Sequence, residues 1–375
     1  MIYIAYYVLY NSKIKRTYVT SAVNKIKYML KSFAKAYDKV EVFSVSRNIE
    51  KDYRFFPSET INDGNISIHH PFSWGGKSKI HSYIMRKWMR ICLFFYLLFK
   101  AKHNEHVYVY HTTGYGRSIL WAKALKKFKL ILEVEEIYSD VQKQDRKLYK
   151  KEKRYFDTAD AFILSTNLLN DSVNKNNKPF IVINGTYETE VLVSDKINDG
   201  KIHVVYAGTF DVRKGSAAAA AAAAEFLNEN YVIHICGFGT DADKQELCKL
   251  IENSNKVNNC KIVFHGLLIG REYISFLQSC HIGLSTQDPT AEFNATSFPS
   301  KILSYLANGL SVVSIKIPAI VQSEVGNCIS YYEDQSPIAI AAAIKSVSFD
   351  KNYRNVIFNL SNKFDKNIVD LKNSI

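Results

Sequence analysis

The feature that most constrains the fold is an alternation of short apolar runs with longer helical stretches along the whole chain. Parallel α/β sheets require this pattern, because each strand is followed by a crossover helix. The expected strands are residues 2–10, 39–44, 107–111, 130–134, 161–165 and 180–183 in the first half, and 202–207, 231–236, 261–265, 282–286, 310–315 and 328–331 in the second. We predict an α/β fold with two Rossmann-like, doubly wound parallel sheets.

The length of 375 residues fits two domains, because single hydrophobic cores stop growing at about 250–300 residues. The polar stretch 194–201 separates the two strand series and is predicted to be a linker. The expected domains are residues 1–193 and 202–350, and a last helix over 351–375 could pack back on the first domain.

The formal net charge of +13 arises in the first 200 residues, which hold 33 Lys and Arg against 20 Asp and Glu. The remainder is balanced, with 16 of each sign. An excess of this size suits an anionic partner, either a nucleic acid or an acidic membrane leaflet. A general preference for surface lysine is the alternative explanation.

The sequence lacks the patterns of a zinc site, a disulfide framework and a membrane-spanning helix. Residues 1–10 are expected to form a first strand rather than a signal peptide, and the apolar run 91–99 is about half as long as a bilayer-spanning helix. We expect a cytoplasmic protein without a metal site, whose thiols are reduced and mostly buried: Cys92, Cys236, Cys248, Cys260, Cys280 and Cys328.

Two loops that follow strands of the second half could bind a diphosphate. Residues 207–215 read AGTFDVRKG, and the exposed amides of such a turn, with the Arg213 and Lys214 side chains, can hold phosphate groups. A solvated basic surface is the alternative. Residues 236–239 read CGFG and repeat the pattern of a strand followed by glycine, although such glycines also serve simple turns.

A third segment, residues 293–301 with the sequence FNATSFPSK, leads into a predicted helix at 302–308. Ser297 or Ser300 can cap this helix, whose free N-terminal amides attract anions. Lys301 stands in the first turn, an unusual place for a cation unless an anion binds nearby. A capped helix with a surface lysine is the alternative interpretation.

From residue 204 to residue 317 the chain resembles the C-terminal domain of family 4-like glycosyltransferases of the GT-B fold. The resemblance rests on YAGTFDVRKG, IHICGFG, KIVFHGLL and SFPSKILSYLANGLSVVS, in the family's order and spacing. It implies two Rossmann-like domains that face a cleft and a metal-independent, retaining hexosyl transfer. The implied donor is a nucleotide sugar, with UDP favoured over GDP, and no cofactor is implied. The implied acceptor is a saccharide or a lipid-linked saccharide in bacterial surface-polysaccharide or capsule synthesis.

The resemblance also implies roles for particular residues. Lys214 matches the family's basic residue that contacts the donor diphosphate, and Arg213, Lys214 and Lys301 would stabilise charge on the leaving diphosphate. The implied donor-binding set is Gly208, Thr209, Arg213, Lys214, Gly237, Thr296, Ser297, Ser300, Lys301 and Ser304.

The sequence departs from the family's pattern at three of these positions. Thr296 and Ser304 stand where the family has two glutamates, and Thr209 replaces a frequent arginine. The ribose contact usually made by the second glutamate is therefore open. Lys301 and the hydroxyls of Ser297 and Ser300 are expected to form the replacement set.

In the first half the resemblance is more limited. Glu135 and Glu136 follow the strand 130–134, where many relatives carry a His-Asp pair that faces the cleft. Glu135 is accordingly a candidate catalytic carboxylate on the acceptor side. Neutralisation of the lysine-rich helix 143–154 is the alternative role for these glutamates.

Residues 86–95 read RKWMRICLFF and combine cations, an aromatic anchor and an apolar stretch. This composition suits a helix in the interface of an acidic bilayer, and a core helix with basic ends is the alternative. The charge asymmetry favours peripheral contact with the inner face of the cell membrane. A nucleic-acid partner is not expected, because interleaved aromatic and basic stacking surfaces are missing.

Two other functions remain open at this stage. A nucleotide-sugar epimerase would share the fold, but the sequence shows no convincing set of acid and base residues for that reaction. A nucleotide-sugar-binding subunit without catalytic activity is credible because both family glutamates are replaced.

Overall fold

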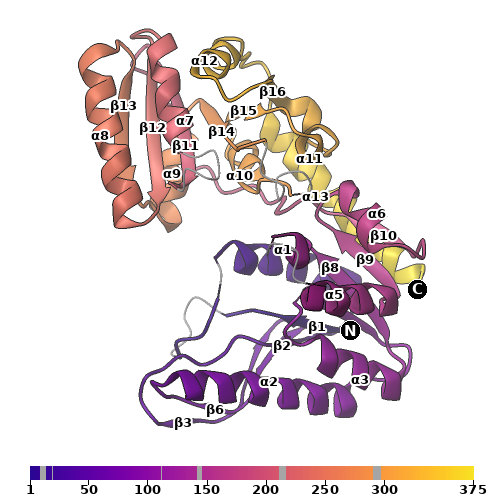
Figure 1. The fold of residues 1–375 in the computed structure, drawn as a ribbon. Coiled ribbons are helices and arrows are strands. Elements are labelled where there is room, and N and C mark those ends of the chain that lie inside the picture. Colours follow the sequence, from indigo (N-terminus) through magenta and orange to yellow (C-terminus); the bar gives the residue numbers. More distant parts are fainter. Residues whose placement is uncertain (9–13, 19, 111, 142–145, 211–216, 290–296) are drawn as a thin grey trace. The chain divides into compact units, whose positions relative to one another are not determined.

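The computed structural model describes the chain except for residues 9–13, 19, 111, 142–145, 211–216 and 290–296 (Figure 1). It divides into two compact units. Unit 1 comprises residues 1–184 and 362–375, and unit 2 comprises residues 185–361. Each unit has its own sheet and its own covering helices.

The described part of unit 1 contains an eight-stranded sheet in the order β10-β9-β8-β7-β1-β2-β5-β4. Neighbouring strands are parallel except for β4 and β5. The strands are β1 (Ile2–Ala5), β2 (Val40–Ser44), β4 (Glu59–Asp63), β5 (Ile66–His70), β7 (His106–Tyr110), β8 (Lys129–Val134), β9 (Ala161–Leu164) and β10 (Phe180–Val182). A small antiparallel pair, β3 (Phe55–Phe56) and β6 (Ser73–Trp74), accompanies it. The chain order reverses at β1, so ligands are expected beyond the carboxyl ends of these central strands.

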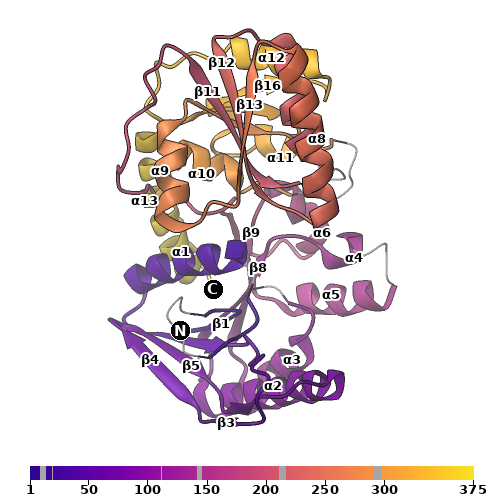
Figure 2. The same ribbon diagram turned by 90° about the vertical axis from the view of Figure 1, so that its left-hand side faces the viewer.

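Helices cover both faces of this sheet, because successive strand residues point in opposite directions. Ile2 and Ile4 belong to the core that α2 and α3 cover, whereas Tyr3 packs against Phe33 of α1 with ring centroids 5.2 Å apart. Figures 1 and 2 show α1 on one face and α2 and α3 on the other. The helices are α1 (Thr20–Ala36), α2 (Lys79–Lys100), α3 (Gly116–Lys126), α4 (Tyr138–Val141), α5 (Arg146–Thr158) and α6 (Asn170–Val173), preceded by a 3-10 turn (Asn167–Leu169).

Helix α2 is amphipathic. Ser78 caps it by accepting a 2.9 Å hydrogen bond from the His81 amide. A stripe at four-residue spacing is buried in the core: Met85, Met89, Leu93 and Leu97. No helix in the described part of the chain is long and apolar enough to cross a membrane.

The described part of unit 2 contains a six-stranded, wholly parallel sheet in the order β13-β12-β11-β14-β15-β16. Its strands are β11 (Ile202–Thr209), β12 (Tyr231–Phe238), β13 (Lys261–Gly266), β14 (Ile282–Ser285), β15 (Ser311–Ile315) and β16 (Ile329–Tyr332). Its helices are α7 (Ala217–Ala222), α8 (Asp241–Val257), α9 (Gly270–Ser279), α10 (Lys301–Ala307), α11 (Pro318–Val321) and α12 (Pro337–Lys345), with 3-10 turns at Ala223–Phe226 and Gly326–Cys328. Both sheets are therefore doubly wound, as the alternation of the sequence predicts.

The boundary of unit 2 falls earlier than the expected linker. Residues 185–193 belong to unit 2, because the Val193 amide donates a 2.8 Å hydrogen bond to Gln278 Oε1 and Gln278 Nε2 donates a 2.9 Å bond to the Val191 carbonyl. The last helix, α13 (Tyr353–Asn373), is shared between the units. Its final part belongs to unit 1, where Asp365 Oδ2 pairs with Lys35 Nζ at 2.6 Å.

A row of three histidines crosses the sheet of unit 2, of which His203 and His234 are buried and His265 is half-buried. His203 Nδ1 lies 2.7 Å from His234 Nε2, and His234 Nδ1 lies 2.9 Å from His265 Nε2. Asp199 Oδ1 lies 3.0 Å from His203 Nε2 at one end of the row. Burial lowers the pKa of His234 to about 3, and the adjacent histidines act in the same direction. His234 is consequently neutral at physiological pH.

Candidate active site

The carboxyl ends of β11 and β12 approach each other closely at two glycines. Gly208 of β11 and Gly237 of β12 are register partners, and Gly237 has a φ of +143°. A Cβ atom on Gly237 would lie only 1.7 Å from the carbonyl oxygen of Gly208. Glycine is therefore required at position 237, and the backbone at both glycines is partly exposed at this edge of the sheet.

Lys301, the first residue of α10, places its ammonium group at the same edge. Its Nζ lies 4.1 Å from the ring centroid of Tyr206 and 2.9 Å from the position that a Cβ atom on Gly208 would take. Burial lowers the pKa of Lys301 to about 8, although the nearby Cys236 thiol acts in the opposite direction. Among the described residues no carboxylate pairs with this ammonium, so it is available to an anion in a poorly solvated environment.

Three tyrosines surround this edge, and the sequence analysis did not select them. The Tyr305 hydroxyl accepts a 2.8 Å hydrogen bond from the Ala207 amide, and Tyr206 lies under Lys301. Tyr273 is hydrogen-bonded to Ser304, and burial raises its pKa to about 12. Ser304 is thus close to the site, but its hydroxyl already has a protein partner. An aromatic residue in an apolar strand or helix usually marks the core, so no sequence signal identified these tyrosines.

The remaining residues of the predicted donor-binding set do not share a single role in the structure. The Thr209 carbonyl accepts a 2.8 Å hydrogen bond from the Tyr206 hydroxyl, which fixes the end of β11. Ser300 precedes α10 but makes no side-chain cap, because its backbone is already helical, with φ −55° and ψ −24°. The prediction that Ser300 caps this helix is therefore wrong. In the described part of the chain, Ser297 does not cap it either. Three predicted residues lie outside the described residues and remain predictions: Arg213, Lys214 and Thr296.

In unit 1, Glu135 follows β8 at the carboxyl edge of the sheet. Its Oε1 lies 3.6 Å from Nζ of Lys25, a buried residue of α1 whose ammonium also donates a 2.8 Å hydrogen bond to the Ile183 carbonyl. The side chain of Glu135 is 30% exposed, so it remains accessible to a ligand. Its ion-pair partner thus comes from α1. The alternative role, neutralisation of the lysine-rich helix predicted at 143–154, would have required a partner from that helix.

Glu133, two residues earlier, faces the same side of β8 and was not selected from the sequence. It is fully buried and accepts a 2.5 Å hydrogen bond from the Tyr3 hydroxyl, while its Oε1 has no hydrogen-bond partner in the described part of the chain. Burial raises its pKa to about 7, Lys25 lowers it, and Glu135 raises it. Glu133 and Glu135 thus form a pair of carboxylates beside Lys25. The sequence does not reveal this pair, because the raised pKa of Glu133 depends on its burial in the folded protein.

Arg16 is a second residue that sequence reasoning missed. It lies in the segment after β1, paired by an antiparallel bridge with Asn48, and is 3% exposed. Its Nε and Nη2 atoms are buried and have no hydrogen-bond partner among the residues that the structure describes. Burial lowers the pKa of Arg16, and the charge of Glu59 only partly opposes this effect. An unpaired guanidinium in the interior costs free energy that a bound anion would recover.

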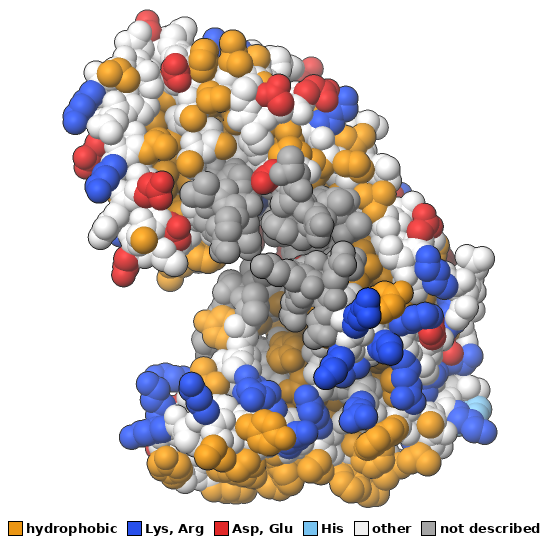
Figure 3. All heavy atoms as spheres, in the orientation of Figure 1, with side chains coloured by type: hydrophobic (Ala, Val, Ile, Leu, Met, Phe, Trp, Pro, Cys, Tyr) orange, Lys and Arg blue, Asp and Glu red, His pale blue; other side chains and the backbone are white. Residues whose placement is uncertain are grey.

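The surface of unit 1 combines apolar and basic side chains. Figure 3 shows hydrophobic side chains gathered over α2 and α3, bordered by lysines and arginines. The exposed apolar residues of these two helices are Ile80, Tyr83, Ile84, Ile91, Phe95, Phe99, Trp121 and Leu125. The sequence allowed α2 to be either a core helix or a helix in the membrane interface. One face of α2 is buried in the core, and the other face is apolar and basic, as an interfacial helix would be.

Residues 201–350 match the family model described as Glycosyl transferases group 1. No curated protein matches the sequence. The fold resembles an E. coli trehalose-6-phosphate structure bound with UDP-2-fluoro glucose, with a TM-score of 0.68, 11% identity and coverage of 100% of this chain and 99% of the other.

Two further solved structures also align with this chain over almost the full length of both proteins. The Anabaena protein HepE, in complex with UDP and glucose, has a TM-score of 0.63, 12% identity and coverage of 100% and 99%. A trehalose-6-phosphate synthase studied with bisubstrate glycomimetics for glycosyltransfer with retention has a TM-score of 0.63, 10% identity and the same coverage.

Two doubly wound units that match these structures along the whole chain define the GT-B fold, and the fold predicted from the sequence is confirmed. Residues 201–350 match the Glycosyl transferases group 1 family, and the chain as a whole has the fold of the GT-B structures compared above.

Proposed function

We propose that this protein transfers a hexosyl group from a UDP-sugar to a saccharide or lipid-linked acceptor in the synthesis of a surface polysaccharide. The observation that carries this proposal is the partly buried Lys301 ammonium beside the two glycines at the carboxyl ends of β11 and β12, inside a segment that matches the group 1 glycosyltransferase family. UDP as the nucleotide is supported by the UDP-2-fluoro glucose and the UDP bound in the two similar structures.

In the proposed mechanism, Lys301 stabilises negative charge that develops on the leaving UDP. Arg213 and Lys214, which follow β11 in the sequence, would add to this effect. Such cations act most strongly when they are positioned beforehand in a poorly solvated site, so the proposed reaction needs neither a metal ion nor a cofactor. Glu135 would orient the acceptor hydroxyl from unit 1. Retention of the anomeric configuration is supported by its study in the similar trehalose-6-phosphate synthase.

We further propose peripheral attachment to the inner face of an acidic membrane through α2 and α3. The support is the apolar surface of these helices and its basic border. The acceptor would then be drawn from the membrane surface. Sedimentation of the protein with acidic vesicles tests this part of the proposal directly.

The donor site is tested by the pH dependence of UDP binding, measured by calorimetry. Because the pKa of Lys301 is about 8, the ammonium is largely charged at pH 7 and largely neutral at pH 9. The affinity of the wild-type protein for UDP should therefore fall about tenfold over this range. Lys301→Ala should bind UDP about tenfold more weakly at pH 7 and lose the dependence on pH.

Lys256→Ala is the matched control, since Lys256 is an exposed lysine of α8. It should keep both the affinity and the pH dependence. Unchanged UDP affinity in Lys301→Ala would refute the assignment. A turnover assay with UDP-sugars and membrane lipid extract completes the test: lipid-dependent release of UDP supports transfer, isomerised sugar indicates an epimerase, and binding without turnover indicates an inactive subunit.

A further inference from the structure

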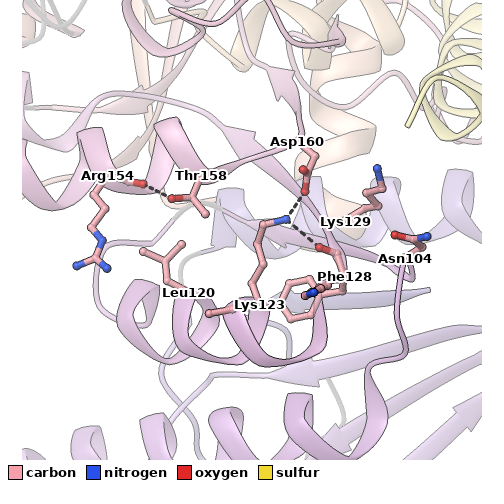
Figure 4. Close-up of a pocket in the computed structure, with 10 residues that line it drawn as sticks. Asn104, Leu120, Lys123, Phe128, Lys129, Arg154, Thr158 and Asp160 are labelled. Carbon is pink, nitrogen blue, oxygen red and sulfur yellow. Dashed lines mark hydrogen bonds and ion pairs between the residues drawn. The ribbon is translucent and has the colours of Figure 1, made fainter.

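A cavity of about 420 Å³ lies in unit 1, between the C-terminal parts of α3 and α5. Asn104, Lys129 and Asp160 line it from the amino ends of β7, β8 and β9 (Figure 4). Lys123 and Lys127 line it from α3 and the residue after it, and Arg154 lines it from α5.

The cavity is strongly basic. Its single lining carboxylate, Asp160, is already engaged, because it pairs with Lys123 and accepts a 2.6 Å hydrogen bond from the Leu130 amide. Figure 4 shows Lys123 directed toward Asp160, with Arg154 and Lys129 on either side of it. Three cations of the lining have no carboxylate partner among the described residues: Lys127, Lys129 and Arg154. The cavity thus carries unbalanced positive charge that suits a compact anion.

This anion is not the donor or the sugar acceptor. Ligands of doubly wound sheets bind at the carboxyl ends of the strands, whereas the cavity lies at the amino ends. Lys129 and Val134 are the two ends of β8, a strand of six residues, and at about 3.3 Å per residue they lie about 17 Å apart. The cavity is therefore separate from the carboxyl edge where Glu135 lies.

The cavity adjoins the apolar surface of unit 1. Trp121 and Leu125 of α3 are 58% and 64% exposed, and each is adjacent in sequence to a residue that lines the cavity. On a helix, adjacent residues lie about 100° apart, so the apolar side chains flank the opening and do not fill it. An amphiphile could place its acyl chains against this surface and its charged headgroup in the cavity.

We propose that this cavity binds the phosphate headgroup of an acidic membrane phospholipid. The proposal rests on the membrane attachment proposed above, and it adds a defined site to an otherwise diffuse attraction. Arg154 would form paired hydrogen bonds with the phosphate oxygens, and Lys127 and Lys129 would contribute point charges. Occupation of the site would orient α3 on the bilayer.

The test uses the full chain and vesicles of phosphatidylcholine with and without phosphatidylglycerol, separated by flotation. Lys127→Gln combined with Arg154→Gln removes two charges from the cavity. Lys150→Gln combined with Lys151→Gln removes two charges from exposed positions of the same helix α5, outside the cavity. We expect the cavity variant to lose about tenfold in partitioning to phosphatidylglycerol vesicles and the control variant to lose less than threefold.

The possible outcomes are distinguishable. Equal losses in the two variants would mean a diffuse charge effect and would overturn the headgroup site. If the cavity variant instead loses binding of inorganic phosphate while its vesicle binding is unchanged, the cavity is a site for free phosphate. This result would also overturn the headgroup site. Failure of the wild-type protein to float with any vesicle would refute the membrane part of the proposed function, whereas wild-type flotation that both variants retain would refute only the headgroup site.

Discussion

Replacing Gly237 by alanine tests whether the close approach of two backbones builds the donor edge of unit 2. The new Cβ atom would lie 1.7 Å from the Gly208 carbonyl oxygen and 2.7 Å from its carbon, whereas real Cβ contacts essentially never fall below 3.0 Å. The strands must therefore separate by more than an ångström at that point. Both partners are backbone atoms within a sheet, so no flexible side chain can absorb the displacement.

Gly266 of β13 provides the matched control. It also has a positive φ, of +68°, but a Cβ atom there would meet nothing within 4 Å. Gly266→Ala should therefore cost only the backbone strain of a left-handed alanine, about 1–2 kcal/mol. Gly237→Ala should cost this strain plus about 1–3 kcal/mol for the enforced displacement.

Thermal unfolding followed by circular dichroism measures the difference. At about 2–4 °C per kcal/mol for a unit of this size, Gly237→Ala should lower the melting temperature by about 10 °C and Gly266→Ala by about 4 °C. UDP affinity should fall only in Gly237→Ala, since only that variant moves the Gly208 backbone. Equal destabilisation of the two variants would refute the close-approach reasoning.

Two predictions concern buried charge. His234 has a folded-state pKa of about 3 against 6.5 for a free histidine, so the unfolded chain binds more protons between these values and stability falls as the pH drops. The free energy of unfolding should fall by about 2 kcal/mol between pH 6.5 and pH 5 in urea titrations, and an equal slope in His234→Gln would contradict this assignment. Arg16→Met should raise the free energy of unfolding at pH 7 by about 1–2 kcal/mol, because it removes an unpaired buried charge; a decrease would show that Arg16 has a compensating partner.

Most of the fold could be predicted from the alternation of apolar runs and helices, because buried parallel strands are apolar on both faces. Four strands of the described part of the chain were not predicted, and they lack this signal. β5 (Ile66–His70) has only two aliphatic residues and ends in two histidines. β4 (Glu59–Asp63) is an antiparallel edge strand whose residues are mostly exposed, and β3 (Phe55–Phe56) and β6 (Ser73–Trp74) have only two residues each. The pairing of such short or polar segments depends on neighbours far apart in the sequence, so local composition does not reveal it.

The candidate site was only partly predictable, for a related reason. Gly208 and Gly237 lie at the carboxyl ends of strands and Lys301 at the start of a helix, and the topology of a doubly wound sheet brings such positions to one edge. The roles of Glu133 and Arg16 depend on burial, which is a property of the folded core. In the sequence, each is an ordinary charged residue.

The distribution of charge shows why composition gave an incomplete account of anion binding. The excess of positive charge lies in the first 200 residues, yet the residues of the proposed donor site all follow residue 200, in the part of the sequence where the charges balance. The interaction of two charges is several times stronger in a partly buried site than in water, so one desolvated ammonium such as Lys301 can outweigh several exposed lysines. Exposed cations act together and at longer range, which suits a surface as extended as a membrane. The second half of the sequence, in which the charges balance, can therefore hold a small anion through few contacts. The basic first half is suited to an extended anionic surface such as a membrane.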